Sequence, residues 1–408
     1  MERDEATLYI RQQCLISFED ALKMQPETRL EKIFSTLDLK PIISRLPRKH
    51  NGPRGYNAKY KLRALIAAKI EQIPTMAALV RRLKNDPVFR YICGFGVIAS
   101  VPSEATMSRF LRELTETGIL KELFNSLVNK AEQMGIIDCT SIAIDSTKIE
   151  AYEKTKPRKY VSQNGKSADW GVKRNTDGNT EAWFGYKVHA AVDTKSELPV
   201  AITVTPANVH DSEIALKLVK KASSVLVKSP KFYLMDSAYD CNDIYETIKN
   251  DFHAQAIIAL NLRGTRQPRA GFDFDGTPIC SAGFRMVYWG SDNGVNKFRC
   301  PHVLDKAECP FGTDWCSSSN YGMVIKTKIE DDSRLFCSPH RGTKNWQKLY
   351  DERTSVERYF GRQKKHLGLE SITVQGTKKV ETHAYLCAIA LIATVTAVNT
   401  AEREQKAA

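Results

Sequence analysis

The sequence predicts an α/β protein in which an all-helical N-terminal domain precedes a mixed sheet interrupted by a long insertion. Apolar residues recur at helical spacing up to about residue 138, and they alternate with polar residues at strand spacing from residue 139 onward. A Gly-, Cys- and Asp-rich stretch then separates the last predicted strand from a late helix. With 408 residues, of which 42% are hydrophobic, the chain is long and apolar enough for more than one folded domain, which excludes a disordered protein.

Three parts follow from these changes in pattern. We expect a helical domain, a sheet domain and an insertion, with boundaries at residues 1–138, at 139–262 and 346–402, and at 263–345, respectively. In the first part, an apolar stripe that includes Leu62 and Ile66 predicts a helix over residues 60–73. Ser103 predicts the N-cap of a later helix. The short helices on either side of Gly94 fit a helix-turn-helix or a plain helical bundle, and the spacing leaves both open.

The predicted sheet begins at residue 141. Alternating and apolar runs predict strands at 141–145, 184–192, 198–204, 231–235 and 256–260, with helices from Asp211 and over 242–250 between the later ones. Antiparallel strands followed by alternating helices and strands favour a mixed sheet. Residues 347–369 predict one continuous helix. The apolar run 386–398 predicts a buried C-terminal helix, because 13 residues are too few to cross a bilayer.

The excess of positive charge points to a polyanionic partner. Lys and Arg number 60 against 47 Asp and Glu, which leaves a net charge of +13 and favours nucleic acid. Residues 45–63 are basic without an acid, and residues 148–174 mix cations with aromatic residues, although a solubilising loop also explains the second stretch. The candidate DNA-binding residues of the first stretch are Arg48, Lys49, Arg54 and Lys59. The charged N-terminus predicts no secretory signal, and we expect a cytoplasmic protein without a membrane partner.

Two aspartates interrupt apolar strands. Asp145 lies within the strand that begins at residue 141, and Asp236 follows the apolar run FYLM. A partly desolvated carboxylate costs several kcal/mol unless it is paired or bound to a cation. The structural alternative is that Asp236 caps the next helix and that Asp145 meets a Lys or Arg.

A third acid comes from the late helix. At about 100° per residue, four polar residues of this helix share one face: Tyr350, Arg353, Glu357 and Lys364. If that helix crosses the sheet, Glu357 can converge with Asp145 and Asp236. Such carboxylates suit Mg²⁺, and two ions about 4 Å apart activate a nucleophile and stabilise the leaving oxygen of a phosphodiester. An ordinary solvated face with salt bridges is the alternative.

These residues carry a resemblance. Tyr350-x2-Arg353-x3-Glu357-x6-Lys364 resembles the Tyr-Arg-Glu-Lys signature around the third acid of DDE transposases from bacterial insertion sequences. AIDSTKIEAY resembles the strand of the first acid, and YLMDSAYD resembles the segment of the second. NDPVFRYICGF and VPSEATMSRFLREL resemble the helical domain that precedes the catalytic domain in such enzymes. The similarity extends from about residue 55 to 395.

The resemblance implies a ribonuclease H-like catalytic domain and a DNA substrate. By this resemblance, Asp145, Asp236 and Glu357 are the catalytic Mg²⁺ ligands, with Mn²⁺ as a substitute ion. It also implies cleavage at the element's ends and attack of the freed 3′ hydroxyls on target DNA. Tyr350, Arg353 and Lys364 would contact the DNA end. Double-stranded DNA, as terminal inverted repeats and target, is the expected partner, and a homodimer associated with the bacterial nucleoid is the expected form.

Two other functions stay open from the sequence. A DNA-binding regulator without catalysis, such as a domesticated transposase, would need the same basic residues. Another nuclease of the same fold would need the same three acids. The Tyr-Arg-Glu-Lys spacing favours the transposase over both.

The insertion is rich in cysteine. Cys300, Cys309, Cys316 and Cys337 are candidate zinc ligands, and Cys280, His302 and His340 are candidate substitutes. Their spacings lack a C-x2-C knuckle, so buried free thiols are the alternative. His210 and Asp211 are interpreted as a helix start rather than as a catalytic pair.

Overall fold

The computed structural model describes residues 17–47, 55–155, 167–174, 179–262, 264, 267–312 and 314–407. The chain forms two compact units, Met1–Ile119 together with Ala393–Ala408, and Leu120–Ile392. The division falls after the first residue of α9 (Ile119–Gln133), so nearly all of this helix belongs to the same unit as the sheet. Each unit is considered by itself.

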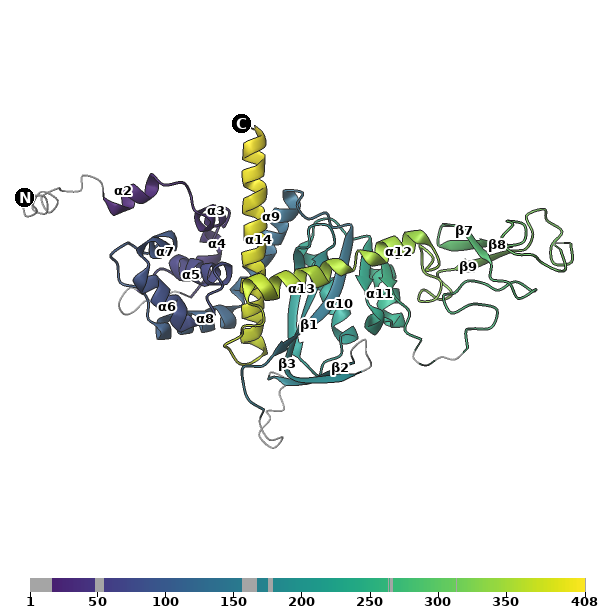
Figure 1. Cartoon of the computed structure of the whole chain (residues 1–408), viewed down its shortest axis with the longest axis horizontal. Helices are drawn as coiled ribbons and strands as arrows, with labels where there is room; N and C mark the ends of the chain where they lie inside the picture. The colour runs from purple at the N-terminus through teal and green to yellow at the C-terminus, as the bar shows by residue number, and fades with distance from the viewer. Residues whose placement is uncertain are drawn as a thin grey trace, which may run out of the picture. The chain divides into compact units, whose positions relative to one another are not determined.

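Regular structure in the described residues of the first unit is helical (Figure 1). Ser103 caps α8 as predicted, because its side chain accepts a hydrogen bond from the amide of Thr106. The connection between α7 and α8 runs from Cys93 to Ser103, which is longer than the turn of about four residues in a helix-turn-helix. The helices are α2 (Phe18–Lys23), α3 (Arg29–Ser35), α4 (Lys40–Ile43), α5 (Ala58–Ile70), α6 (Met76–Asn85), α7 (Pro87–Ile92) and α8 (Glu104–Thr117).

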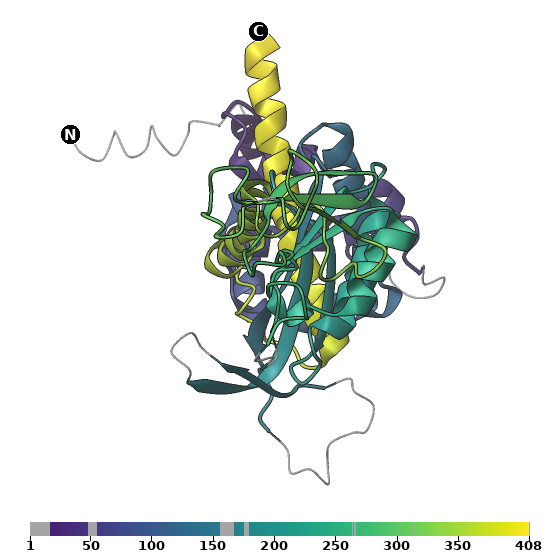
Figure 2. The same cartoon turned by 90° about the vertical axis from the view of Figure 1, so that its right-hand side faces the viewer.

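The second unit contains the mixed sheet that the sequence predicts. Its order is β2-β3-β1-β5-β6, with β4 paired to β3. β1 runs antiparallel to β3 and parallel to β5, and β5 runs parallel to β6. The strands are β1 (Ser141–Glu150), β2 (Asp169–Arg174), β3 (Thr180–Asp193), β4 (Pro199–Pro206), β5 (Phe232–Met235) and β6 (Gln255–Ile258). The sequence did not indicate β2, which forms a ribbon with β3 that extends from the sheet (Figure 2).

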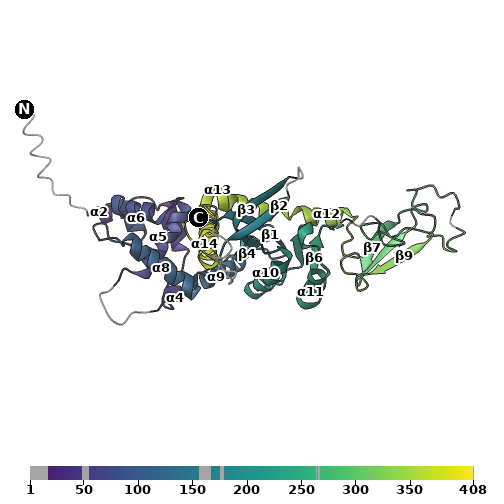
Figure 3. The same ribbon diagram turned by 90° about the horizontal axis from the view of Figure 1, so that it is seen from below.

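Helices cover both faces of this sheet. Figure 3 shows α12 (Lys344–Asp351) and α13 (Thr354–Leu367) on one face, and α10 (Ser212–Val225) and α11 (Asn242–Phe252) on the other. The central strand β1 is therefore buried on both sides, and Ile142, Ala143 and Ile144 are fully inaccessible to solvent. A carboxylate on this strand stands in a largely apolar setting.

The late helix differs from the prediction of one continuous helix over 347–369. It consists of α12 and α13, joined at Glu352 and Arg353. At this junction the amide of Glu352 donates to the carbonyl of Leu349, and the amide of Arg353 donates to that of Tyr350, at 3.1 and 2.9 Å. Bonds over three residues tighten the turn and interrupt the α-helical ladder. Tyr350 therefore belongs to a different helix from Glu357.

The C-terminal helix α14 (Thr377–Ala407) is longer than the predicted apolar run. By length and composition it is the one candidate membrane span among the described residues, but 61% of its most apolar window is buried inside the protein. Residues such as Leu386 and Ile389 lie in the core. This burial agrees with the predicted buried helix.

The insertion forms a small sheet of its own. β7 (Val287–Asp292), β8 (Val295–Arg299) and β9 (Val324–Lys328) are antiparallel in that order. Arg334 ties the insertion to the main sheet domain, because its guanidinium contacts both oxygens of the fully buried Asp240 at 2.8 and 2.5 Å.

Candidate active site

Strand register brings the two aspartates to the same level. Ala143 of β1 pairs with Leu234 of the parallel strand β5. Asp145 and Asp236 each follow two residues later, and neighbouring residues of parallel strands at one level point to the same face. The apolar strands thus carry their two acids to one place at the sheet surface.

The third acid reaches the same place through an arginine. α13 packs on β1 and β3, and Arg353 lies at its N-terminus. The Arg353 guanidinium has Nη1 3.7 Å from Oδ2 of Asp145 and Nη2 2.8 Å from Oε1 of Glu357. Asp145 and Glu357 therefore share one guanidinium, whose charge also acts on Asp236.

The two aspartates are held in a setting that disfavours negative charge. Burial and, to a smaller extent, the charge of Asp236 raise the pKa of Asp145 to about 7, although the Ser146 amide and Arg353 oppose the shift. Burial likewise raises the pKa of Asp236. Two desolvated carboxylates at one level repel each other, and a bound cation would relieve that repulsion.

The structural alternatives considered for the aspartates are also present. Oδ1 of Asp236 caps the short 3₁₀ helix η2 (Ser237–Tyr239) by accepting from the amide of Ala238 at 2.9 Å. Asp145 meets Arg353. However, neither contact neutralises the pair, because the pKa of Asp145 stays near 7 in the presence of both. The helix cap made by Asp236 and the contact of Asp145 with Arg353 therefore leave part of the negative charge uncompensated, and a bound cation would compensate it.

Two further side chains belong to this site, although the sequence did not single them out as functional. The hydroxyl of Tyr239 is buried and has no hydrogen-bond partner within the described part of the chain. Burial and the charges of Asp145, Asp211 and Asp236 raise its pKa well above the ordinary value. Asp211, interpreted from sequence as a helix start, raises the pKa of both site aspartates and binds Nζ of Lys187 at 3.0 Å. The only available signal for Tyr239 was its position three residues after Asp236.

Of the other signature residues, Tyr350 lies beside Arg353, whereas Lys364 pairs elsewhere. Burial and, to a smaller extent, the charges of Asp236 and Asp145 raise the pKa of Tyr350. Tyr350 stacks on Trp346, with ring centroids 4.9 Å apart, and its ring faces the Arg353 guanidinium at 5.7 Å. Lys364 binds Oε1 of Glu370 at 2.6 Å instead of joining the acids. The predicted single stripe of four is therefore wrong as a helical face, since the break at residues 352–353 separates its first member.

The carboxylates suit Mg²⁺ by their chemistry. Hard oxygen ligands and a partly desolvated pair are what this ion requires. Glu357 is 54% exposed and held by Arg353, so the described side chains do not yet form a set of three ligands around one point.

Several predicted DNA-binding residues lie outside the described residues: Arg48, Lys49 and Arg54. Lys59 is described, in the first turn of α5, where it is partly buried. Part of the second basic stretch, 156–166, also lies outside the described residues.

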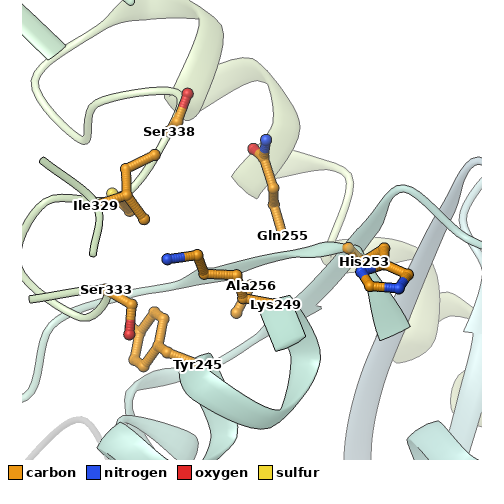
Figure 4. Close-up of a pocket in the computed structure, with 10 residues that line it drawn as sticks. Tyr245, Lys249, His253, Gln255, Ala256, Ile329, Ser333 and Ser338 are labelled. Carbon is orange, nitrogen blue, oxygen red and sulfur yellow. The ribbon is translucent and has the colours of Figure 1, made fainter. Parts of the chain in front are cut away.

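The predicted zinc ligands do not all meet. Cys300, Cys309 and Cys316 line one small cavity. Cys337 lies elsewhere, at a cavity of about 220 Å³ that Tyr245 and Lys249 also line (Figure 4). Its thiol donates to the carbonyl of Pro339 at 3.4 Å. The predicted grouping of Cys337 with the other three is therefore wrong, because the chain between Cys316 and Cys337 returns through β9 to the base of the insertion.

Comparison with known proteins gives two family matches. A family model described as "Transposase DDE domain" matches residues 139–393. A second, described as "Transposase domain (DUF772)", matches residues 18–113. Among solved structures, the chain is similar to a piggyBac transposase synaptic complex with hairpin DNA, at 9% identity and a TM-score of 0.41, over 91% of this chain and 75% of that one.

Proposed function

The chain belongs to the transposase family defined by its DDE domain, and from that premise we propose that it is a DNA transposase of a bacterial insertion sequence. It cleaves the ends of its element and joins the freed 3′ hydroxyls to target DNA. We assign the mixed sheet to the ribonuclease H type, with Asp145 and Asp236 on adjacent strands and Glu357 on the covering helix.

The observation that carries this proposal is that the charge of Arg353 acts on all three acids, with direct contacts to Asp145 and Glu357. The three acids come from a central strand, the end of its parallel neighbour and a helix remote in sequence. A solvated charged face, the alternative for the helix, would not place Arg353 between Glu357 and a partly buried residue of the central strand. The match of residues 139–393 to a DDE domain supports the same assignment of roles.

The side chains at this site have separate tasks. Asp145, Asp236 and Glu357 would hold the Mg²⁺, for which Mn²⁺ would substitute. When bound, the ion supplies charge neutralisation for the scissile phosphate and lowers the pKa of the attacking water or hydroxyl. Arg353 holds Glu357 beside the site until a cation and DNA phosphates compete for it. The Tyr239 hydroxyl, for which the described residues supply no hydrogen-bond partner, would donate a hydrogen bond inside the site.

Basic and aromatic residues outside the acids bind the DNA. Tyr350 and Lys364 contact the element end, the former as a stacking surface and the latter as a phosphate contact. Arg48, Lys49, Arg54 and Lys59 grip the terminal inverted repeats. The net charge of +13 supports a polyanionic partner of this kind.

The active form is a dimer that works in the cytoplasm on nucleoid DNA. Two element ends must be cut and joined in concert, whereas one active site handles one strand at a time. Sedimentation with end DNA should yield a complex of two chains and two ends. A complex of one chain and one end at protein excess would contradict the dimer.

The test of the function is a cleavage and joining assay on the element's own ends. Purified protein, labelled end DNA and a supercoiled target plasmid should give nicked ends and joined products with Mg²⁺ or Mn²⁺, and none with a chelator. DNA binding without either product would support a regulator. Cleavage of unrelated DNA to the same extent would support a general nuclease.

A further inference from the structure

The insertion contains a long loop that its own packing does not explain. From Cys300 to Met323 the described residues form turns without a helix or strand. Two of its aromatic residues, Phe311 and Trp315, are 63% and 49% exposed and pack on each other. Each ordered residue costs about 1–2 kcal/mol of backbone entropy, and burial in this loop supplies little in return.

The loop nevertheless returns closely to its start. Gly322 has a φ of +66°, and a Cβ added there would lie 2.7 Å from Cβ of Cys300. The amide of Cys300 donates to the carbonyl of Met323 at 3.0 Å. Both ends of the loop are thus fixed at the end of β8, next to a cysteine.

Four cysteines from separate segments line one cavity at this point. Cys280 occupies a tight hairpin closed by the bridge between Ile279 and Arg285, and Cys300 follows β8. Cys309 and Cys316 come from the loop itself. All four line a cavity of about 10 Å³, together with His302. That volume holds one small ion and excludes an organic ligand.

We propose that Cys280, Cys300, Cys309 and Cys316 bind one structural zinc ion that holds the loop to the sheet of the insertion. Four thiolates are a ligand set typical of closed tetrahedral zinc sites. In the described ranges, no group of three or more His, Cys, Asp or Glu side chains is arranged so that it could hold a metal ion. The proposed site therefore requires the four cysteine side chains to turn inward from the cavity wall and to lose their protons as the ion binds.

His302 is the nearest competing ligand. Its Nδ1 lies 3.2 Å from the carbonyl oxygen of Ala307 and 3.4 Å from the amide of Cys309. These contacts give the ring a role in shaping the loop between two ligands. His340 takes no part, because it is buried against Tyr288 and Phe298 and bonds Thr277 at 2.8 Å.

The test is metal analysis of the full chain purified without chelator. We expect about one zinc per chain in the unmodified protein. Cys280→Ser, Cys300→Ser, Cys309→Ser and Cys316→Ser should each lose most of it. His302→Ala and the matched controls Cys241→Ser and Cys337→Ser should keep it. Less than about 0.2 zinc per chain, iron in its place, or equal loss in the Cys337→Ser control would overturn the site.

A second measurement covers variants that fail to fold. In the unmodified protein, zinc should protect four thiols from maleimide, and a chelator should expose them, with the labelled peptides identified by mass spectrometry. Equal labelling with and without chelator, or a disulfide between these cysteines in freshly purified protein, would contradict the proposal. Asp145→Asn should retain zinc, so the result is independent of the transposase activity.

Discussion

Nη1 of Arg353 lies 3.7 Å from Oδ2 of Asp145, yet the pKa of Asp145 is still raised to about 7. The guanidinium therefore compensates only part of the cost of burial and of the charge on Asp236. A divalent ion would compensate more, since it carries twice the charge and binds the oxygens directly. Arg353 is best understood as a partner of the acids that a metal and DNA displace.

Removing this arginine should strengthen metal binding while weakening DNA binding. In Arg353→Ala, no cation competes for Asp145 and Glu357, so we expect Mn²⁺ to bind several-fold more tightly by calorimetry. End-DNA affinity should fall by about tenfold or more. Arg358→Ala is the matched control, because Arg358 lies on the same helix and pairs with Glu197. Weaker Mn²⁺ binding in Arg353→Ala would show that the arginine positions the acids instead.

Metal affinity should depend on pH in the range set by Asp145. Because its pKa is about 7 without metal, a proton competes with the ion below pH 7, and apparent Mn²⁺ affinity should fall by up to about tenfold per pH unit from 7 to 5. Above pH 8 the apparent Mn²⁺ affinity should become independent of pH. Calorimetry in buffers of different ionisation enthalpy would count the protons released.

The same shift predicts how stability varies without metal. A folded pKa of about 7 against an ordinary 3.8 means that the folded state keeps a proton that the unfolded state loses. Stability should therefore fall as pH rises from about 4 to 7, by at most about 4 kcal/mol from this group. Asp145→Asn should gain stability over the parent at pH 8 and little at pH 4. An equal difference at both values would contradict the raised pKa.

Replacing Tyr239 by Phe should raise the stability of the protein and lower its cleavage activity. Its buried hydroxyl lacks a partner among the described residues, so Tyr239→Phe should raise the free energy of unfolding by about 1 kcal/mol. Cleavage of end DNA should nevertheless slow by about tenfold if the hydroxyl acts in the site. Tyr233→Phe is the matched control: it loses the 2.9 Å bond to Ser223, so it should be less stable with unchanged cleavage. Unchanged cleavage in Tyr239→Phe would remove this residue from the site.

Breaking the ion pair between Arg334 and the buried Asp240 should destabilise the protein more than breaking an exposed pair. Arg334→Ala leaves the fully buried Asp240 without its guanidinium, which should cost about 3–5 kcal/mol of stability. Arg269→Ala, which removes an exposed pair with Asp332, should cost less than about 1 kcal/mol. Urea unfolding of both variants measures the difference, and equal losses would show that the buried pair is not special.

The sequence was most informative where local pattern determines structure. Alternation around Ile142 and Ile144 predicted β1, and the apolar run before Asp236 predicted β5. Once these two strands were paired, it followed that Asp145 and Asp236 lie side by side. Ser103 predicted its helix start because a cap is a local interaction.

Features that depend on hydrogen bonding or on contacts between distant residues could not be predicted from the sequence. The break at Arg353 depends on hydrogen bonds over three residues, which leave no mark on apolar spacing. The role of Tyr239 arises from burial beside charges that lie far apart in sequence. Cys280, and not Cys337, lines the same cavity as Cys300, Cys309 and Cys316. This depends on how the hairpin that contains Cys280 meets β8, and the spacing of the cysteines carries no information about that contact.

The central claim is that Asp145, Asp236 and Glu357 together form the site that cuts DNA. The most direct measurement is cleavage of labelled end DNA by Asp145→Asn, Asp236→Asn and Glu357→Gln, with a gel shift on the same samples. Each variant should lose cleavage and joining with Mg²⁺ and with Mn²⁺, yet bind end DNA within about twofold of the parent, because binding rests on basic residues. Asp351→Asn, at an exposed acid on α12, should cleave normally. Substantial cleavage by any of the three acid variants would contradict the assignment of the site.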